Sequence, residues 1–176
     1  MSARVRRCAV LAALLAVALA GSCGYRIVGV GGKLPGGVTR VEVPVFENHT
    51  PRTDAARIMT EDFITQLLGS AKLSVVSGNE VAQAVIQGSV TGYRREPITF
   101  DSKQKPLENS LTIVMDVSLV ARDTKHVLFR EKNVTVRFDF PVKSDLQEND
   151  RLEDEALRTV SKMMSQKLVS LMLESF

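Results

Sequence analysis

The sequence of 176 residues has no tryptophan, few aromatic residues, two cysteines and two histidines. Aromatic residues make up 5% of the chain, so the core of a folded domain has to be mainly aliphatic. Cys8, Cys23, His49 and His126 do not have the spacing of a metal site. The short motifs of common hydrolases and metalloproteases are also missing. These absences argue against an enzyme, a bound metal and a cofactor.

Long apolar runs are missing too, since spanning a bilayer takes about 20 consecutive apolar residues. The run over 8–20 is shorter and follows a segment with three arginines. A positive segment, a short apolar run and a small-residue cleavage site are the parts of a bacterial export signal. We therefore expect residues 1–22 to be a signal peptide and the mature protein to leave the cytoplasm.

Two cleavage sites compete at the end of this signal. The segment 18–20, Ala-Leu-Ala, fits ordinary signal peptidase, which would release a soluble protein. The segment 20–23, Ala-Gly-Ser-Cys, resembles a lipobox, although the usual leucine stands one position early, at Leu19. A single cysteine left in an oxidising compartment has no internal disulfide partner, and acylation accounts for it. This favours a lipoprotein with its lipid on Cys23.

Cleavage also changes the charge of the chain. The whole sequence has 23 basic and 20 acidic residues, and removal of the three signal arginines leaves 20 against 20. The mature chain therefore has no net positive field to attract nucleic acid, and we expect no nucleic-acid partner. An anionic ligand would have to bind a local group of basic residues.

The mature chain divides into a glycine-rich segment, 23–37, which suits a lipidated tether, and a single domain, 38–176. Alternating apolar residues predict a half-buried strand over 38–46. Its buried face would consist of Val41, Val43 and Val45.

A helix over 54–68 and a short strand over 73–76 are predicted next, which completes a βαβ unit with parallel strands. The extended segment over 81–95 carries two glycines on its apolar face. Gly88 and Gly92 therefore predict a bulge there, or close packing against a helix.

The segment 96–108 reads as a polar loop, followed by a clearly alternating strand over 111–121. A turn at 123–125 leads to a return strand over 127–140, in which the apolar positions change from odd to even numbers. That change of parity predicts a β-bulge near Lys132.

A long helix is predicted over 150–176, with Asp150 and Glu153 as a capping box. The elements together predict an α+β fold, a two-layer sandwich in which two helices cover one face of a mixed sheet of four to five strands. The predicted buried stripe of the last helix is Leu152, Ala156, Val160, Met163, Met164, Leu168 and Leu171.

Local positive charge is the remaining candidate for a binding site. Antiparallel pairing of the later strands would bring five basic residues to one end of the sheet, where they would suit phosphates or sugar-acid carboxylates. The alternative is a solvated loop without a ligand. The five residues are Arg94, Arg95, Lys103, Lys105 and Lys143.

Three segments resemble a known family when taken in order. They are Cys23-Gly24-Tyr25, the stretch 41–50 (VEVPVFENHT), and the stretch 82–90 (AQAVIQGSV), in which Gln83 stands where that family usually has aspartate. The later strands and the long last helix follow in the same order. The ordered set resembles the LPS-assembly lipoprotein family, LptE.

The resemblance implies a lipid-anchored protein on the periplasmic face of the cell outer membrane. It implies a place as a plug in a β-barrel translocon, LptD, and a part in lipopolysaccharide transport. Binding of lipopolysaccharide through basic residues is implied as well, with Lys103, Lys105 and Lys143 as the nearest positions. Two alternatives remain: another lipoprotein adaptor, such as an activator of a cell-wall synthase, and a periplasmic enzyme.

Overall fold

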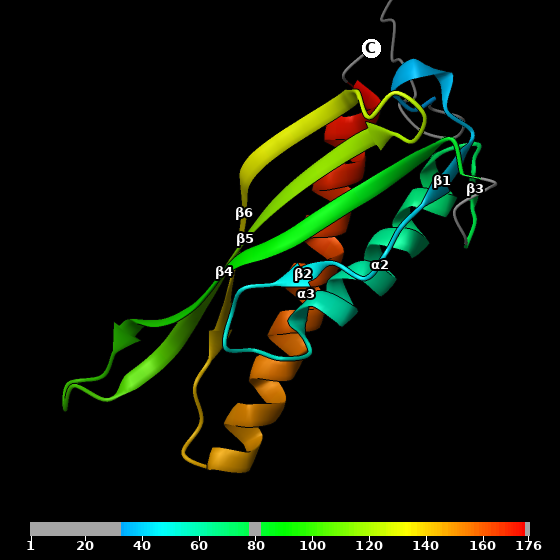
Figure 1. Ribbon diagram of the computed structural model, residues 1–176. Helices are drawn as coiled ribbons and strands as arrows, with labels where there is room; N and C mark the ends of the chain where they lie inside the picture. The colour runs from blue at the N-terminus through cyan, green and yellow to red at the C-terminus, as the bar shows by residue number, and fades with distance from the viewer. Residues whose placement is uncertain (1–32, 78–81, 175–176) are drawn as a thin grey trace, which may run out of the picture.

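Two helices lie on one face of a six-stranded mixed sheet in the computed structural model, which describes residues 33–77 and 82–174 (Figure 1). This confirms the predicted α+β sandwich class, with one strand more than expected. The signal and Cys23 lie outside the described residues. The elements are η1 (Pro35–Gly37), β1 (Arg40–Glu42), β2 (Glu47–Asn48), α2 (Ala55–Ser70), β3 (Ser74–Val75), β4 (Ala84–Phe100), β5 (Pro106–Ala121), β6 (Val127–Pro141) and α3 (Leu146–Glu174).

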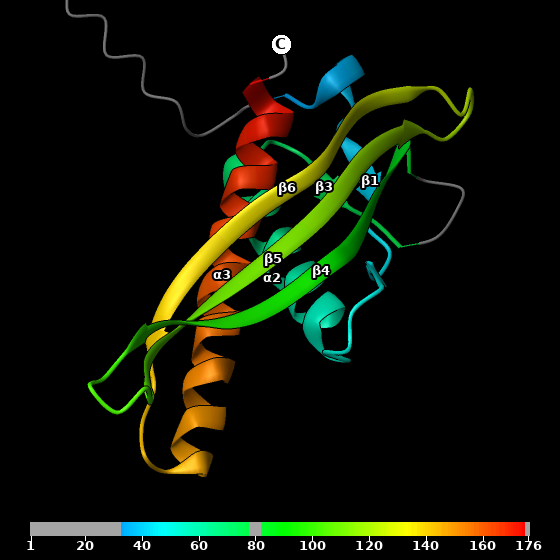
Figure 2. The same cartoon turned by 90° about the vertical axis from the view of Figure 1, so that its left-hand side faces the viewer.

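The sheet has the strand order β3-β1-β4-β5-β6, and β2 pairs with β4 farther along the edge that β1 occupies. β1 is parallel to β3, which confirms the predicted βαβ unit, and both β1 and β2 are parallel to β4. β4, β5 and β6 form an antiparallel meander. In both views the helices cover the same face of this meander, so its other face is open (Figures 1 and 2).

The extra strand arises because the predicted first strand is interrupted. The chain leaves the ladder between β1 and β2, around Pro44, which has no backbone N–H to donate. The N–H of Phe46 instead donates to Thr60 Oγ1 on α2, at 3.0 Å. The alternation restarts after this break, so Phe46 is 4% exposed and Val45 is 68% exposed. The prediction that Val45 faces the core was therefore wrong.

The Phe46 ring occupies space that a side chain on β4 would otherwise fill. A Cβ atom built on Gly88 would lie 2.6 Å from the ring, which is closer than carbon atoms pack. The same ring contacts Phe63 of α2, with the ring centroids 5.4 Å apart. Gly88 therefore packs closely against a connecting segment, and not against a helix as one of the two alternatives predicted. The predicted bulge lies between Val90 and Gly92.

The segment predicted as a polar loop, 96–108, is mostly β-hairpin, so that prediction was wrong. β4 continues to Phe100 and β5 begins at Pro106, with a tight turn between them. The Thr99 hydroxyl donates to Glu108 across the hairpin at 2.8 Å. We call residues 96–108 the arm, because in both views this hairpin end projects away from the helices (Figures 1 and 2).

The β-bulge predicted near Lys132 is present. Met115 pairs with Val134 and Val117 with Glu131, so Asp116 faces two residues of β6. Asn133 adopts a positive φ of 56°, and its N–H donates to Asp116 Oδ1 at 2.8 Å. The bulge moves the buried positions from odd to even numbers, as the sequence pattern indicated.

The last helix begins at Leu146, four residues before the predicted start, so the proposed capping box was wrong. Asp145 accepts the Gln147 N–H at 2.9 Å and takes the capping role. Much of the predicted stripe is buried, but Met163 is 41% exposed. The buried residues of α3 are Ala156, Leu157, Val160, Ser161, Met164, Ser165, Leu168, Val169 and Met172.

Replacement of Gly88 by alanine should lower the free energy of unfolding by about 1–3 kcal/mol, because the new methyl group collides with the Phe46 ring. Urea denaturation would measure this change. The control is Gly69→Ala on α2, where nothing lies within 4 Å and the change should stabilise by about 0.5–1 kcal/mol. Adding Phe46→Leu to Gly88→Ala should recover part of the loss. Equal stability of Gly88→Ala and the unchanged protein would contradict this account.

Candidate functional site

The antiparallel meander brings the five predicted basic residues to the same end of the sheet. Lys103 and Lys105 lie in the turn at the tip of the arm, and Arg94 and Arg95 lie on β4 where the arm begins. The Val142 N–H donates to the Leu107 carbonyl at 2.8 Å, so the chain leaves β6 beside the arm just before Lys143.

The turn at the tip is held by a single carboxylate. Asp101 Oδ1 accepts the N–H groups of Lys103 and Lys105, at 2.8 and 2.9 Å. Gln104, between the two lysines, takes a positive φ of 61°. The backbone of both lysines is therefore fixed, while their side chains are exposed to solvent.

Lys143 is also held through its backbone. The side chain of Asn149 accepts its N–H at 2.7 Å and donates to its carbonyl at 2.8 Å. Arg151, chiefly through a hydrogen bond, and also Lys143 by its charge lower the pKa of Glu148 below its usual value. Within 33–77 and 82–174, no ion pair within 4.0 Å joins Lys103, Lys105 or Lys143 to an acid.

The two arginines of β4 have partners within the protein. Arg94 lies 3.5 Å from Glu96, and both side chains are largely exposed. Arg95 forms an ion pair with Glu153 of α3, whose side chain is 13% exposed. Consecutive residues of a strand point to opposite faces, so Arg95 faces the helices and Arg94 faces the open side of the sheet. The three lysines are therefore the most available cations of the predicted set.

Glu153 also binds a tyrosine that sequence reasoning did not single out. The Tyr93 hydroxyl donates to Glu153 Oε1 at 2.5 Å. Burial, followed by the hydrogen bond to Glu153, raises the pKa of Tyr93 well above its usual value. Tyr93, Arg95 and Glu153, which we call the clasp, join β4 to α3 where the arm begins. The bulge after Val90 turns Tyr93 and Arg95 toward the helices, and alternation alone did not indicate that.

A second link holds the beginning of α2 near the clasp. The Arg52 guanidinium donates to Asp54 and to Asp154 of α3, each at 2.6 Å. The hydrogen bond from Arg52 chiefly lowers the pKa of Asp54 below its usual value. The base of the arm and both helices are thus tied together by charged side chains.

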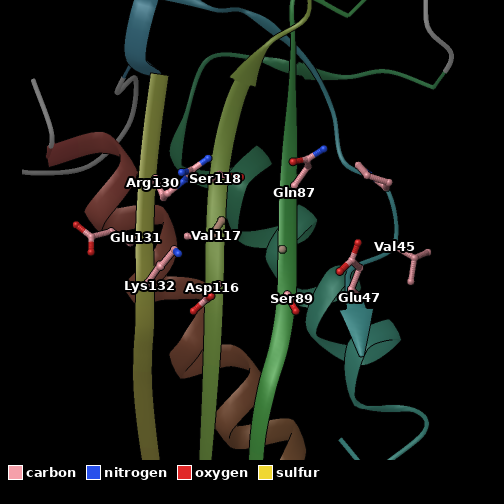
Figure 3. Close-up of a pocket in the computed structure, with 12 residues that line it drawn as sticks. Val45, Glu47, Gln87, Ser89, Asp116, Val117, Ser118, Arg130, Glu131 and Lys132 are labelled. Carbon is pink, nitrogen blue, oxygen red and sulfur yellow. The ribbon is translucent and has the colours of Figure 1, made fainter. Parts of the chain in front are cut away.

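The open face of the sheet is polar and carries a hollow of about 530 Å³ (Figure 3). The side chains around it come from β2, β4, β5, β6 and the connection between β1 and β2, and they include both signs of charge. The labelled residues are Val45, Glu47, Gln87, Ser89, Asp116, Val117, Ser118, Arg130, Glu131 and Lys132.

Neither histidine lines this hollow, although His49 is next to Glu47, which does. His49 Nε2 lies 3.3 Å from a carboxylate oxygen of Glu47, and His126 is in the β5–β6 turn. In the part of the chain that the structure describes, no three histidine, cysteine, aspartate or glutamate side chains are grouped so as to hold a metal ion. Among the same residues, no helix is long and apolar enough to cross a membrane.

The variant Tyr93→Phe should unfold at lower urea, with a loss of about 1.5 kcal/mol at pH 8, because a hydrogen bond to a carboxylate is removed. The raised pKa of Tyr93 means that its contribution is complete below the unfolded value of 10.0 and declines as the pH rises above it. The stability difference between the two proteins should therefore shrink between pH 8 and pH 11. A difference that stays constant or grows would contradict the assigned role of the clasp.

Solved structures of several bacterial proteins have a similar fold. The chain is similar in fold to lipoprotein B from Nitrosomonas europaea (17% identity, TM-score 0.55), with 83% of this chain and 88% of that chain covered. A lipoprotein from Caulobacter crescentus has 9% identity and a TM-score of 0.54, with 75% and 88% covered. PelC from Paraburkholderia phytofirmans, a dodecamer, has 16% identity and a TM-score of 0.50, with 82% and 94% covered.

These likenesses show the fold alone, because the identities are low. No curated protein matches the sequence significantly. The family comparison is more specific: residues 38–172 match the family LptE, described as lipopolysaccharide-assembly. The match runs from just before β1 to near the end of α3, and so includes the arm, the clasp and the open face. The chain therefore belongs to the LptE family of lipopolysaccharide-assembly lipoproteins.

Proposed function

We propose that this protein is an outer-membrane lipoprotein, anchored on the periplasmic side through an acylated Cys23. There it occupies the lumen of the β-barrel translocon LptD and assists the assembly of lipopolysaccharide at the cell surface. The match of residues 38–172 to the LptE family carries this proposal. The role is one of binding and assembly without catalysis.

The two faces of the sheet support a place inside a barrel. One face carries the apolar core under α2 and α3, and the other presents serine, threonine, glutamine and charged side chains with a few valines among them. The lumen of a large membrane barrel is polar, so an open polar face suits contact with its wall and with the water inside. A mature chain with equal numbers of basic and acidic residues also suits a lumen that carries both signs of charge.

Lys103, Lys105 and Lys143 are the proposed contacts for the phosphates of lipopolysaccharide. Their backbones are fixed by Asp101 and Asn149, and their ammonium groups have no ion pair within the described residues. An exposed lysine binds phosphate as a point charge without first breaking an internal salt bridge. Arg94 and Arg95 belong to the same group, but they already form ion pairs with Glu96 and Glu153. We therefore expect these two arginines to contribute less to lipopolysaccharide binding than the lysines.

Detergent extraction tests the partner and the anchor. Extraction of envelopes with mild detergent should co-purify the protein with a β-barrel protein identified by mass spectrometry. A Cys23→Ser variant should leave the membrane fraction, because it cannot be acylated, while a Cys8→Ser variant should fractionate like the unchanged protein. Capture of a cell-wall synthase in place of a barrel would favour the adaptor alternative. Retention of the unchanged protein in the cytosol would contradict the proposal.

Replacement of the three lysines by glutamine tests whether they bind lipopolysaccharide. A Lys103→Gln, Lys105→Gln, Lys143→Gln variant should bind purified lipopolysaccharide at least tenfold more weakly, since one exposed lysine near an anionic lipid surface contributes about 1 kcal/mol. Surface-immobilised lipopolysaccharide would measure the binding. The control is Lys125→Gln in the opposite hairpin turn, which should leave affinity unchanged. A loss of binding free energy in Lys125→Gln that is about one third of the loss in the triple variant would show that the effect reflects net charge alone.

A further inference from the structure

Three large apolar side chains are exposed at the end of the arm. Ile98 is 38% exposed, and Phe100 and Leu107 are each 46% exposed. Phe100 pairs with Pro106, the neighbour of Leu107, so all three residues belong to the last few positions of the hairpin. Exposed apolar residues that gather in one place indicate a binding surface, whereas scattered ones do not.

Positive charge accompanies this apolar surface. The segment 98–107, which we call the arm tip, contains Lys103 and Lys105 and a single acid, Asp101. The Asp101 carboxylate is directed at the backbone of the turn, where it accepts two N–H groups. The two ammonium groups therefore dominate the outer end of the arm tip, directly beside apolar side chains.

The arm tip is also organised before any partner binds. The ladder between β4 and β5 continues to the pair Phe100 and Pro106, and the Thr99–Glu108 hydrogen bond crosses it. The arm projects away from both helices, so a flat partner can reach its tip without displacing the core (Figure 2). Binding would therefore cost little conformational entropy.

We propose that the arm tip inserts into the surface of a membrane that contains anionic lipids. Its apolar side chains enter the boundary between head groups and acyl chains, and its two lysines contact lipid phosphates. Apolar groups flanked by lysine are suited to this boundary, because the apolar side chains can lie among the acyl chains while the ammonium groups remain at the hydrated head groups. Two lysines against one aspartate leave the arm tip with a net positive charge, which favours negatively charged head groups.

The opposite end of the sheet offers an internal comparison. The β5–β6 turn is also stabilised by an aspartate, since Asp123 accepts the Thr124 N–H at 2.6 Å, and it also carries a lysine, Lys125. None of the exposed large apolar residues of the described chain lies there. The combination of apolar and positive side chains therefore distinguishes the arm tip from an ordinary hairpin turn.

This inference goes beyond the proposed function, because it requires neither the barrel nor lipopolysaccharide. Its test uses the mature chain with Cys23→Ser, so that an attached lipid cannot cause binding. The sequence has no tryptophan, so Phe100→Trp introduces a single fluorescent reporter at the arm tip. Leu68→Trp on α2 places the same reporter at another exposed apolar position, 49% exposed.

Vesicles that contain phosphatidylglycerol should shift the Phe100→Trp emission to the blue, and lipids with brominated acyl chains should quench it. Vesicles of phosphatidylcholine alone and inorganic phosphate should do neither. Leu68→Trp should not respond to any of these additions. Circular dichroism would first confirm that both reporters are folded.

Two sets of changes in the Phe100→Trp protein separate the contribution of the lysines to vesicle binding from that of the apolar side chains. Lys103→Gln with Lys105→Gln should weaken vesicle binding about fivefold per lysine, and Lys125→Gln should not weaken it. Ile98→Ser with Leu107→Ser should abolish quenching by brominated lipid. The inference is overturned if phosphatidylglycerol vesicles cause no shift, if Leu68→Trp shifts equally, or if the reporter responds only to a purified barrel protein.

Discussion

The packing of the Phe46 ring against Gly88 is the contact on which the two-layer arrangement depends. It can form only because the chain leaves the sheet around Pro44 and returns with Phe46 directed inward. The N–H of Phe46 then binds Thr60, and its ring contacts Phe63, so α2 is held against β4 by one residue of a connecting segment. With α2 in place, α3 completes the helical layer, and the other face of the sheet remains polar.

Two β-bulges then determine which side chains belong to the core. The bulge after Val90 turns Tyr93 and Arg95 toward α3, where both bind Glu153 and fix the base of the arm. The bulge opposite Asp116 keeps β6 in contact with the helices through its apolar residues. Beyond the clasp neither α2 nor α3 covers the hairpin, so the arm is left outside the core of the described residues with its lysines exposed.

The resulting molecule separates three tasks in space. The aliphatic core under the helices provides stability, the open face provides a polar contact surface, and the arm carries cations beside apolar groups. All three regions lie within the part of the chain that matches the LptE family of lipopolysaccharide-assembly proteins. The fold presents these surfaces of different chemistry on different elements, so each can make its own kind of contact.

The sequence by itself determined the types of most elements, the parallel βαβ unit and the bulge near Lys132, because these follow from alternation and chain order. It also indicated that the five basic residues meet at one end, since antiparallel strands return there. Only the tertiary structure decided that Phe46 and not Val45 is buried, that the arm is a hairpin, and that Glu153 binds Tyr93. Each of these outcomes depends on a partner distant in the sequence, which local periodicity does not contain.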